Sequence, residues 1–365
     1  MQQFLAIDSN KKYFTKNILL WNNKSNVRLM PWKGEKDPYK IWLSEIILQQ
    51  TRVDQGWDYY NRFIKAYPDI NKLARAPEQK IFKMWEGLGY YTRCKNLIAT
   101  ARFIAKEKKG KFPDTYEDIL ALKGIGPYTA AAITSFAFNL KYAVVDGNVF
   151  RVLSRFFGIN NAINSTAGKK IFTAFANELI DKNEPGIYNQ AIMDFGAVIC
   201  KPKNPLCNIC PLKNKCNARL NDLTDKLPVK EGSITIKARW FYYLMVEFNG
   251  RIYVRKRAAN DIWQNLYEFT LLESEKLMTI GKIKESALFK KISIKNKLTI
   301  ISVSKLHKQQ LTHQIIQGRF IHIKAKKPPD LKEYRAVTPK ELNKLPFPKF
   351  ITGYKAENEA KTFER

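Results

Sequence analysis

The chain has 365 residues, and 63 Lys and Arg against 33 Asp and Glu give it a formal net charge of +30. This length predicts two or three globular domains, and the charge favours a polyanionic partner such as nucleic acid over the alternative, a general lysine bias. No apolar run reaches membrane-spanning length or resembles a signal peptide. We therefore expect a cytoplasmic protein with no membrane partner, and a monomer, since nothing indicates obligate oligomerisation.

The first 220 residues predict a helical domain, beginning with DPYKIWLSEIILQQ (37–50), where Asp37 is the expected N-cap and Pro38 the first helical residue. Glu45 lies inside the apolar run IWLSEIIL, where a carboxylate is costly unless it is paired or functional. If it is buried, its pKa is raised and it can donate a proton near neutral pH. A partly exposed helix position is the alternative.

Further helices are predicted at 115–122, 129–138, 148–157 and 167–180, each bounded by Gly, Pro, Asn or Asp. Gly124 and Gly126, in LKGIGPYTAAAI, precede one of them. Such a turn can present N–H groups to a phosphate, although many helix junctions share the pattern. Asp146 ends an apolar run just before a helix, and an N-cap is its simplest interpretation.

Four of the five cysteines lie in CKPKNPLCNICPLKNKC (200–216), with the spacing C-x6-C-x2-C-x5-C. The candidate metal ligands are Cys200, Cys207, Cys210 and Cys216. Clustered thiols in an intracellular protein indicate a soft metal rather than disulfides. Zinc sites usually pair two C-x2–4-C units and only one is present, so the spacing favours a 4Fe–4S cluster while zinc stays open.

The pattern changes after Leu220. Residues 221–233 are polar and predict a linker. Residues 234–257 alternate with period two around Asn249-Gly250, a strong hairpin signal, and 318–325 predicts another strand. The predicted organisation is therefore a mainly helical domain at 1–220, a linker at 221–233 and a smaller α+β domain at 234–365.

Five motifs occur in an order that resembles the adenine DNA glycosylases of the MutY family, in the helix–hairpin–helix superfamily that includes endonuclease III. They are DPYKIWLSEIILQQTRV, EGLGYYTRCKNL, LKGIGPYTAAAI, VVDGNVFRVL and the cysteine loop. The resemblance is strong over residues 28–216. It implies a six-helix barrel with a 4Fe–4S cluster domain, followed by a Nudix-like domain, of which 261–273 (DIWQNLYEFTLLE) resembles a signature. The acidic metal-binding helix of a working Nudix hydrolase is missing.

The resemblance implies a base excision repair enzyme that flips adenine, paired with 8-oxoguanine or guanine, out of double-stranded DNA and hydrolyses its glycosidic bond. By motif position, Glu45 is the expected general acid, and Asp146 stabilises the oxocarbenium-like sugar. The residues implied in lining the adenine or sugar site are Trp32, Lys33, Asn148 and Gln190. Those implied in wedging into the duplex are Gln50, Leu88 and Tyr90, while Gly124 and Gly126 grip a phosphate.

One segment and one residue depart from common family patterns, and a further residue distinguishes the chain from bifunctional relatives. Leu311, Thr312 and His313 stand where the family commonly has Phe-Ser-His for recognising 8-oxoguanine, so the aromatic ring is lost. Lys33 replaces a common arginine and cannot make a two-pronged contact. Tyr128 stands where bifunctional relatives carry a Schiff-base lysine, and this predicts a monofunctional glycosylase that uses water.

Two alternative functions stay open. One is an endonuclease III-like glycosylase/lyase for oxidised pyrimidines, against which Tyr128 and the C-terminal domain argue. The other is a catalytically silent iron–sulfur DNA-binding protein, against which the retention of Glu45 and Asp146 in their motifs argues.

Overall fold

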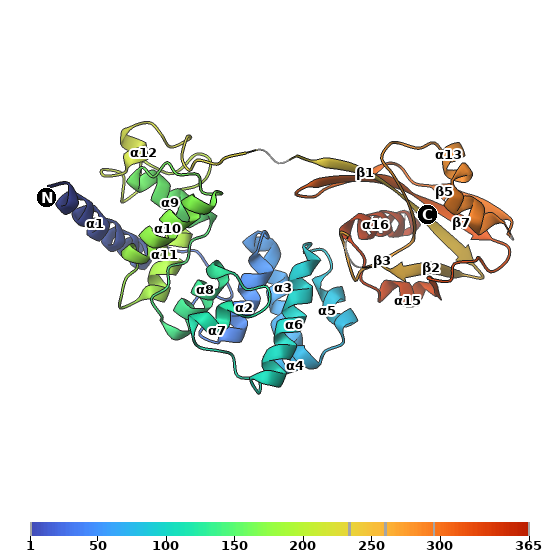
Figure 1. The fold of residues 1–365 in the computed structure, drawn as a ribbon, viewed down its shortest axis with the longest axis horizontal. Coiled ribbons are helices and arrows are strands. Elements are labelled where there is room, and N and C mark those ends of the chain that lie inside the picture. The colour runs from blue at the N-terminus through green and yellow to red at the C-terminus, as the bar shows by residue number, and fades with distance from the viewer. Residues whose placement is uncertain (1, 233–234, 259–260, 295, 364–365) are drawn as a thin grey trace. The chain divides into compact units, whose positions relative to one another are not determined.

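The structure is a computed structural model that describes residues 2–232, 235–258, 261–294 and 296–363, so residues 233 and 234, where the predicted linker ends and the second domain begins, lie outside the described residues. Tertiary contacts divide the chain into two units, whose helices and strands are labelled in Figure 1. One comprises Met1–Arg75 and Asn96–Gly232, and the other Ala76–Lys95 and Ser233–Arg365.

The first unit is helical, as predicted. Its helices are α1 (Gln2–Ser25), α2 (Pro38–Leu48), α3 (Val53–Ala66), α4 (Ile70–Arg75), most of α6 (Tyr91–Glu107), α7 (Tyr116–Leu120), α8 (Pro127–Phe138), α9 (Gly147–Phe157), α10 (Thr166–Leu179), α11 (Pro185–Val198) and α12 (Asn217–Leu220). The five predicted helices agree with α2 and α7–α10 to within two residues at each end. Asp37 caps α2 by accepting a hydrogen bond from the Tyr39 N–H at 2.9 Å.

A core of aromatic and aliphatic side chains joins α1 to α9, α10 and α11, although more than a hundred residues separate α1 from these helices in the sequence. Phe14 of α1 contacts Phe156 of α9, and Trp21 packs edge-on against Phe195 of α11. Three cysteines of the 200–216 loop pack against this same core. The cysteine loop is therefore attached to the helices that follow Asp146.

Most of the predicted linker is bound to the first unit. Leu227 is buried, the Val229 carbonyl accepts a hydrogen bond from the Ile163 N–H at 3.0 Å, and the Glu231 carbonyl accepts one from the Asn164 side chain at 2.6 Å. The backbone of this polar stretch therefore finds hydrogen-bond partners in the first unit.

The second unit is a mixed sheet with helices. Its strands are β1 (Lys237–Phe248), β2 (Arg251–Lys256), β3 (Tyr267–Glu268), β4 (Thr270–Ser274), β5 (Leu298–Val303), β6 (His307–Gln310), β7 (Gln314–Ala325) and β8 (Arg335–Val337). Its helices are α5 (Glu78–Trp85), α13 (Ile280–Glu285), α14 (Ala287–Ser293), α15 (Pro339–Asn343) and α16 (Lys349–Phe363). The principal strand order is β3-β2-β1-β7-β5, and β1 runs parallel to β7.

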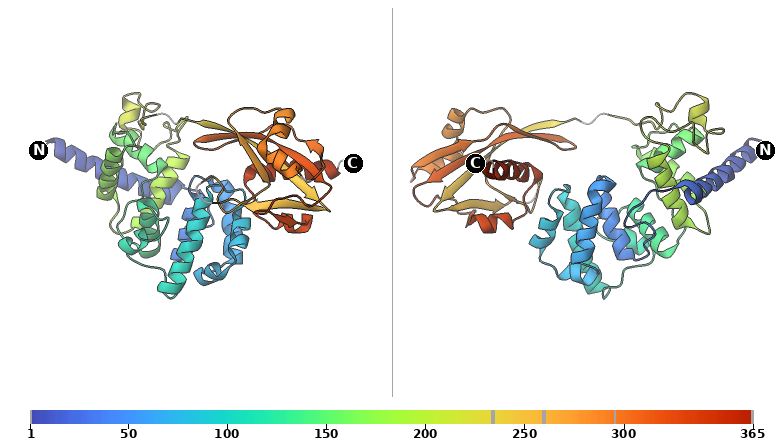
Figure 2. Two further views of the ribbon diagram at one scale, coloured as in Figure 1. Left: turned by 45° about the vertical axis from the view of Figure 1, so that its right-hand side comes forward. Right: turned by 180° about the vertical axis from the view of Figure 1, so that it is seen from behind.

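The β1–β2 hairpin turns at Asn249-Gly250, as predicted, and both residues have positive φ angles, 49° and 70°. Helices of the second unit lie on both sides of its sheet (Figure 2), and successive residues of a strand such as β1 face opposite sides. Tyr242 and Leu244 pack in one apolar cluster with Phe289 of α14. Tyr243 contacts the Phe350 ring of α16 on the other side. Helices therefore cover both faces of the sheet.

Residues 76–95 group with the second unit rather than with the helical unit that surrounds them in the sequence. The Glu86 carboxylate accepts a hydrogen bond from the Phe347 N–H at 3.1 Å, and the Tyr91 hydroxyl donates to the Phe347 carbonyl at 3.5 Å. The domain boundaries drawn from composition therefore differ from the division by contacts.

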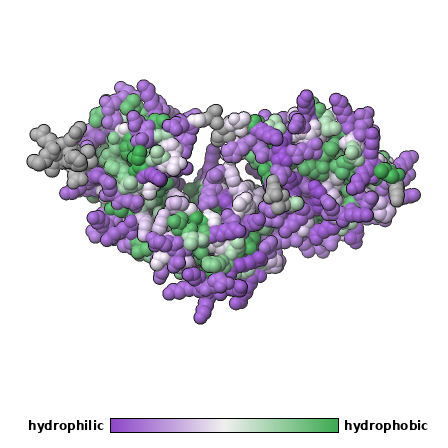
Figure 3. Space-filling view, viewed as in Figure 1, coloured by the Kyte–Doolittle hydropathy of each residue, from purple (hydrophilic) through white to green (hydrophobic). Residues whose placement is uncertain are grey.

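Hydrophilic side chains cover most of the face shown in Figure 3. Within the described part of the chain, none of the helices is both long enough and apolar enough to span a bilayer.

Candidate active site

A cavity of about 410 Å³ lies in the first unit, walled by α2, α8, α9, α11 and the segment after α1. Its volume falls in the range of small-molecule sites. Seven of the predicted site residues line it, namely Trp32, Lys33, Glu45, Tyr128, Asp146, Asn148 and Gln190. Side chains separated by up to 158 positions in the sequence are therefore brought together.

Glu45 is buried on α2, with 5% of its surface exposed, so of the two interpretations that the sequence left open the structure has the buried one. Burial is the main cause that raises the pKa of Glu45 to about 7; the nearby Asp146 raises it further, and a hydrogen bond with the Tyr128 hydroxyl lowers it. A carboxyl with this pKa is protonated in a large fraction of molecules at neutral pH. It can therefore donate a proton to a bound group.

Asp146 has a different environment. As predicted, it caps α9: one carboxylate oxygen accepts from the N–H groups of Asn148 and Val149 at 2.9 and 2.8 Å. The other oxygen accepts from the Asn148 side-chain amide at 2.7 Å. Burial raises the pKa of Asp146, and these three donors together with Arg151 oppose that rise. Asp146 therefore presents a carboxylate whose two oxygens are oriented by three hydrogen-bond donors.

A buried carboxylate that we did not predict, Asp194 of α11, organises one wall of the cavity. Its two oxygens accept from Lys33 at 3.0 Å, from Gln190 at 3.0 Å and from Arg28 at 2.7 Å, and Asn26 donates to it as well. Asp194 is fully buried, so these donors offset the cost of removing its charge from water. It fixes the two predicted residues, Lys33 and Gln190, at the cavity wall.

A second missed residue, Arg151 of α9, links the cavity to the cysteine loop. Its guanidinium donates to the Asn148 side-chain oxygen at 2.8 Å and to the Cys200 carbonyl at 2.7 Å. It also donates to the Gly147 and Gly196 carbonyls. Asn148, which donates to Asp146, is therefore oriented by Arg151.

The glycine turn lies between α7 and α8. Gly124 has φ +81°, and an added Cβ would lie 2.7 Å from the Asn96 side chain. Gly126 is the N-cap of α8 and has no side chain to satisfy the first N–H groups of that helix. Gly124 is exposed and Gly126 half-buried, so an anion can approach the turn before α8. Gln50, also exposed, follows α2 with φ +56°.

The remaining predicted contacts lie in the second unit. Leu88 is buried, with 6% of its surface exposed, so wedging into a duplex would require it to leave its packing. Tyr90 is 46% exposed, and its hydroxyl is hydrogen-bonded to the Thr312 hydroxyl. Thr312 and His313 are exposed and Leu311 is half-buried in the turn between β6 and β7.

The four clustered cysteines line one small apolar pocket together with Arg155. The Arg155 guanidinium donates to the Cys200 sulfur at 3.5 Å, and the Cys216 thiol donates to the Arg155 carbonyl at 3.5 Å. Burial raises the pKa of Cys210 to about 12, so a bound cation is needed to hold it as a thiolate. Four thiols around one pocket are a donor set that suits a 4Fe–4S cluster. Among the described residues no group of His, Cys, Asp and Glu is arranged to hold a single metal ion.

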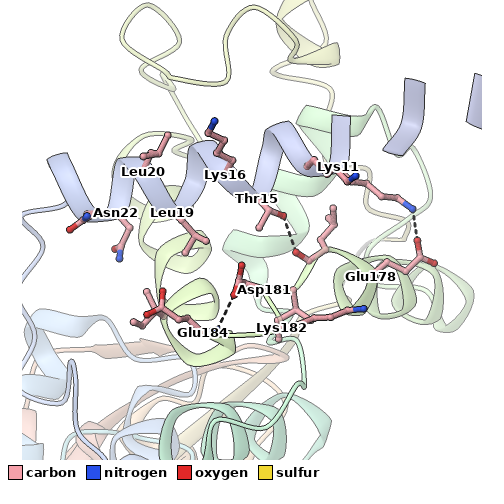
Figure 4. A pocket seen from close by; sticks show the side chains of 15 residues that line it. Lys11, Thr15, Lys16, Leu19, Leu20, Asn22, Glu178, Asp181, Lys182 and Glu184 are labelled. Carbon is pink, nitrogen blue, oxygen red and sulfur yellow. Dashed lines mark hydrogen bonds and ion pairs between the residues drawn. The ribbon is translucent and has the colours of Figure 1, made fainter. Parts of the chain in front are cut away.

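A larger groove of about 940 Å³ runs between α1 and the connection from α10 to α11 (Figure 4). Its charged side chains are partly paired with one another, as in the Lys11–Glu178 pair at 2.7 Å, and Thr15 donates to the Leu179 carbonyl at 2.9 Å. None of the predicted site residues lines it. The smaller cavity, which holds Glu45 and Asp146, is therefore the candidate active site.

Comparison with known families and relatives gives consistent matches. Residues 43–178 match the HhH-GPD superfamily of base excision DNA repair proteins, and 241–355 match the NUDIX domain. The adenine DNA glycosylase of Buchnera aphidicola subsp. Baizongia pistaciae is 37% identical, over 78% of this chain and 80% of the relative. The adenine DNA glycosylase of Rattus norvegicus is 37% identical over 61% of this chain and 45% of the relative. The adenine DNA glycosylase of Homo sapiens is 38% identical over 56% of this chain and 39% of the relative.

Among solved structures, a thermostable thymine-DNA glycosylase is 31% identical with a TM-score of 0.55, covering 59% of this chain and 99% of its own. A non-covalent endonuclease III–DNA complex is 19% identical with a TM-score of 0.50, and the match covers 58% of this chain and 96% of the endonuclease III chain. The latter likeness supports the helical fold of the first unit.

Proposed function

The chain belongs to the adenine DNA glycosylases, and on that premise we propose that it removes adenine paired with 8-oxoguanine or guanine in double-stranded DNA. It is a DNA glycosylase of base excision repair, and its net charge of +30 suits a DNA partner. We expect it to act as a monomer in the cytoplasm, on the nucleoid of a bacterial cell.

The observation that carries the proposed chemistry is the pair of unlike carboxyl groups that line one cavity. Glu45, with its pKa raised to about 7 by burial, is the proposed general acid that protonates the flipped adenine. Asp146, oriented by its three hydrogen-bond donors, is the proposed stabiliser of the oxocarbenium-like sugar. Glycosidic cleavage uses one carboxyl group as a general acid and a second to stabilise the sugar cation. The different environments of Glu45 and Asp146 support this assignment.

Tyr128 supports hydrolysis by water without strand cleavage. A phenol cannot form an imine with the sugar, and its hydroxyl is engaged in a hydrogen bond with Glu45. Purified enzyme should therefore give little borohydride-trapped complex with substrate DNA. Trapping as efficient as that of a lyase would overturn the monofunctional assignment.

The DNA contacts are proposed by motif position. The turn of Gly124 and Gly126 would bind a backbone phosphate, and Trp32, Lys33, Asn148 and Gln190 would line the adenine and sugar site. The exposed Gln50 and Tyr90 are the better candidates for wedging into the duplex, because Leu88 is buried. The turn of Leu311, Thr312 and His313 is the proposed contact with 8-oxoguanine.

The cysteine pocket is the proposed site of a 4Fe–4S cluster, held by Cys200, Cys207, Cys210 and Cys216. When bound, the cluster would brace the loop mechanically and take no part in breaking the glycosidic bond. The loop carries four lysines, which suit a contact with the DNA backbone.

A glycosylase assay on three duplexes, containing A:8-oxoguanine, A:G and thymine glycol:A, tests the proposal after cleavage of abasic sites by alkali. We expect abasic sites opposite 8-oxoguanine and G and none at thymine glycol. Activity on the thymine-glycol duplex alone would instead establish the endonuclease III-like alternative. Absence of activity on all three would establish a silent DNA-binding protein.

A further inference from the structure

The turn between β6 and β7, formed by Leu311, Thr312 and His313, is closed by backbone hydrogen bonds at its base. The Leu311 N–H donates to the Gln314 carbonyl at 2.7 Å, and the His313 carbonyl accepts from the Lys237 N–H at 3.0 Å. Gln314 is the first residue of β7 and pairs with Lys237 of β1. The position of the turn therefore depends on how β1 holds the start of β7.

Arg239 of β1 makes a side-chain connection to that position. Its guanidinium forms a two-pronged contact with Glu273 at 2.6 and 2.8 Å and another with Asp261 at 2.7 and 2.9 Å. A fifth hydrogen bond, at 3.2 Å, goes to the side-chain oxygen of Gln314. A guanidinium has five N–H donors, so every donor of Arg239 is used.

The carboxylates that hold Arg239 are themselves anchored in the sheet. Asp261 also accepts hydrogen bonds from Arg257 and from the Ile262 N–H. Arg257 in turn pairs with Glu268, which is buried. The Arg239 guanidinium lies over the Phe241 ring at 4.9 Å from its centre and is itself largely buried, with 13% of the side chain exposed. The side chain that reaches Gln314 thus has one well-defined position.

We propose that Arg239 is a positioning residue for recognition of the base opposite adenine: it fixes Gln314, and through it the turn at 311–313. This inference rests on the proposed function of that turn in contacting 8-oxoguanine. Lysine cannot replace Arg239, because a single ammonium group cannot serve both carboxylates in a two-pronged manner and still reach Gln314. The exposed tip of the turn is also contacted by a hydrogen bond between the hydroxyls of Thr312 and Tyr90. The turn is therefore held at its base by Arg239 and at its tip by Tyr90.

The test compares Gln314→Leu and Arg239→Lys with wild type, using the ratio of kcat/KM on A:8-oxoguanine to kcat/KM on A:G. Gln314→Leu removes the acceptor but leaves both carboxylates paired with Arg239, so it avoids the risk that Arg239→Lys unfolds the sheet. Gln317→Leu is the matched control, since Gln317 lies on the same strand and its side chain has no hydrogen bond among the described residues. Thermal unfolding of each variant reports the stability of the fold.

We expect Gln314→Leu and Arg239→Lys each to lower the ratio about tenfold, the effect of losing one charge-assisted hydrogen bond, while Gln317→Leu keeps it within about twofold. A merely structural role would lower both rates together and leave the ratio unchanged, and that result would overturn the inference. The variant Thr312→Ala distinguishes recognition of the opposite base by the turn from positioning of the turn by Arg239. If it lowers the ratio and Gln314→Leu does not, recognition by the turn stands and the role of Arg239 is refuted. If wild type shows no preference for 8-oxoguanine, the proposed function of the turn itself fails.

Discussion

Replacing Glu45 with Gln should stabilise the fold above neutral pH while greatly slowing adenine excision. Burial raises the pKa of this carboxyl from the ordinary 4.5 to about 7 in the folded protein. Its contribution to stability is therefore fully present below pH 4.5, declines as the pH rises, and is lost above about pH 7. At 1.36 kcal/mol per pH unit, the cost of ionising Glu45 at pH 8 is about 3 kcal/mol. Gln carries no ionisable proton, so the variant escapes this cost.

Urea unfolding of both proteins at pH 5 and pH 8 measures the difference, with tryptophan fluorescence as the signal. Trp42 lies on the same helix as Glu45 and is 1% exposed, so it reports on that core. We expect nearly equal unfolding free energies at pH 5, and at pH 8 a variant more stable by about 3 kcal/mol. Excision by the variant should fall by a factor of roughly 100 to 10,000, the usual contribution of a general acid.

Glu35 lines the same cavity, and Glu35→Gln is a control that should change the free energy of unfolding in the opposite direction. Burial alone would raise the pKa of Glu35, but the N–H groups of Asp37 and Lys36 donate to its carboxylate and, with Lys40, lower it overall. Its stabilising effect is present above the unfolded pKa and is lost as the pH falls through the folded pKa. Glu35→Gln should therefore destabilise the protein at pH 8. The reasoning about Glu45 is refuted if Glu45→Gln changes stability equally at both pH values.

Three further predictions follow from the site. Tyr128→Phe removes the hydrogen bond that lowers the pKa of Glu45, so the pH above which single-turnover excision slows should rise; a pH–rate profile with an unchanged or lower break would contradict this. Gly124→Ala forces a Cβ onto Asn96 at a positive φ and should weaken DNA binding in a titration at fixed salt, whereas Gly126→Ala, with nothing within 4 Å of the added Cβ, should bind more nearly like wild type. Cys207→Ser should lower the iron content and visible absorbance of purified protein, and full retention of both would contradict the proposed cluster ligands.

The fold could be predicted where local chemistry decides it. Asp37 and Pro38 mark the start of α2, and Asn249-Gly250 marks the β1–β2 turn, because caps and tight turns depend on neighbouring residues alone. β7 was predicted to begin at 318, yet it begins at Gln314. Its first residues are polar in part, and they are held as a strand by pairing with β1, which no local pattern reveals.

The site shows the same limit. Glu45 stood out because an acid lies in an apolar run, although that pattern left burial and partial exposure both open. The same pattern occurs at both missed residues, Asp194 in AIMDFGAV and Arg151 in NVFRVLSRFF. The partners of these two residues could not be predicted in this way. Arg28 and Asp194 are 166 positions apart, and only the packing of the segment after α1 against α11 brings them together.

The grouping of residues 76–95 with the second unit bears on how this protein can be divided into fragments. A fragment ending at Gly232 would retain α5 and the start of α6 without the segment around Phe347 that they contact. The Glu86 carboxylate would lose its backbone donor, and apolar surface that is now covered would face water. A helical fragment cut off after Gly232 would therefore expose the surface of residues 76–95 that the second unit now covers, and it would be prone to self-association. The two units follow one another for most of the sequence, but the second unit is completed by residues 76–95, which lie within the sequence of the first.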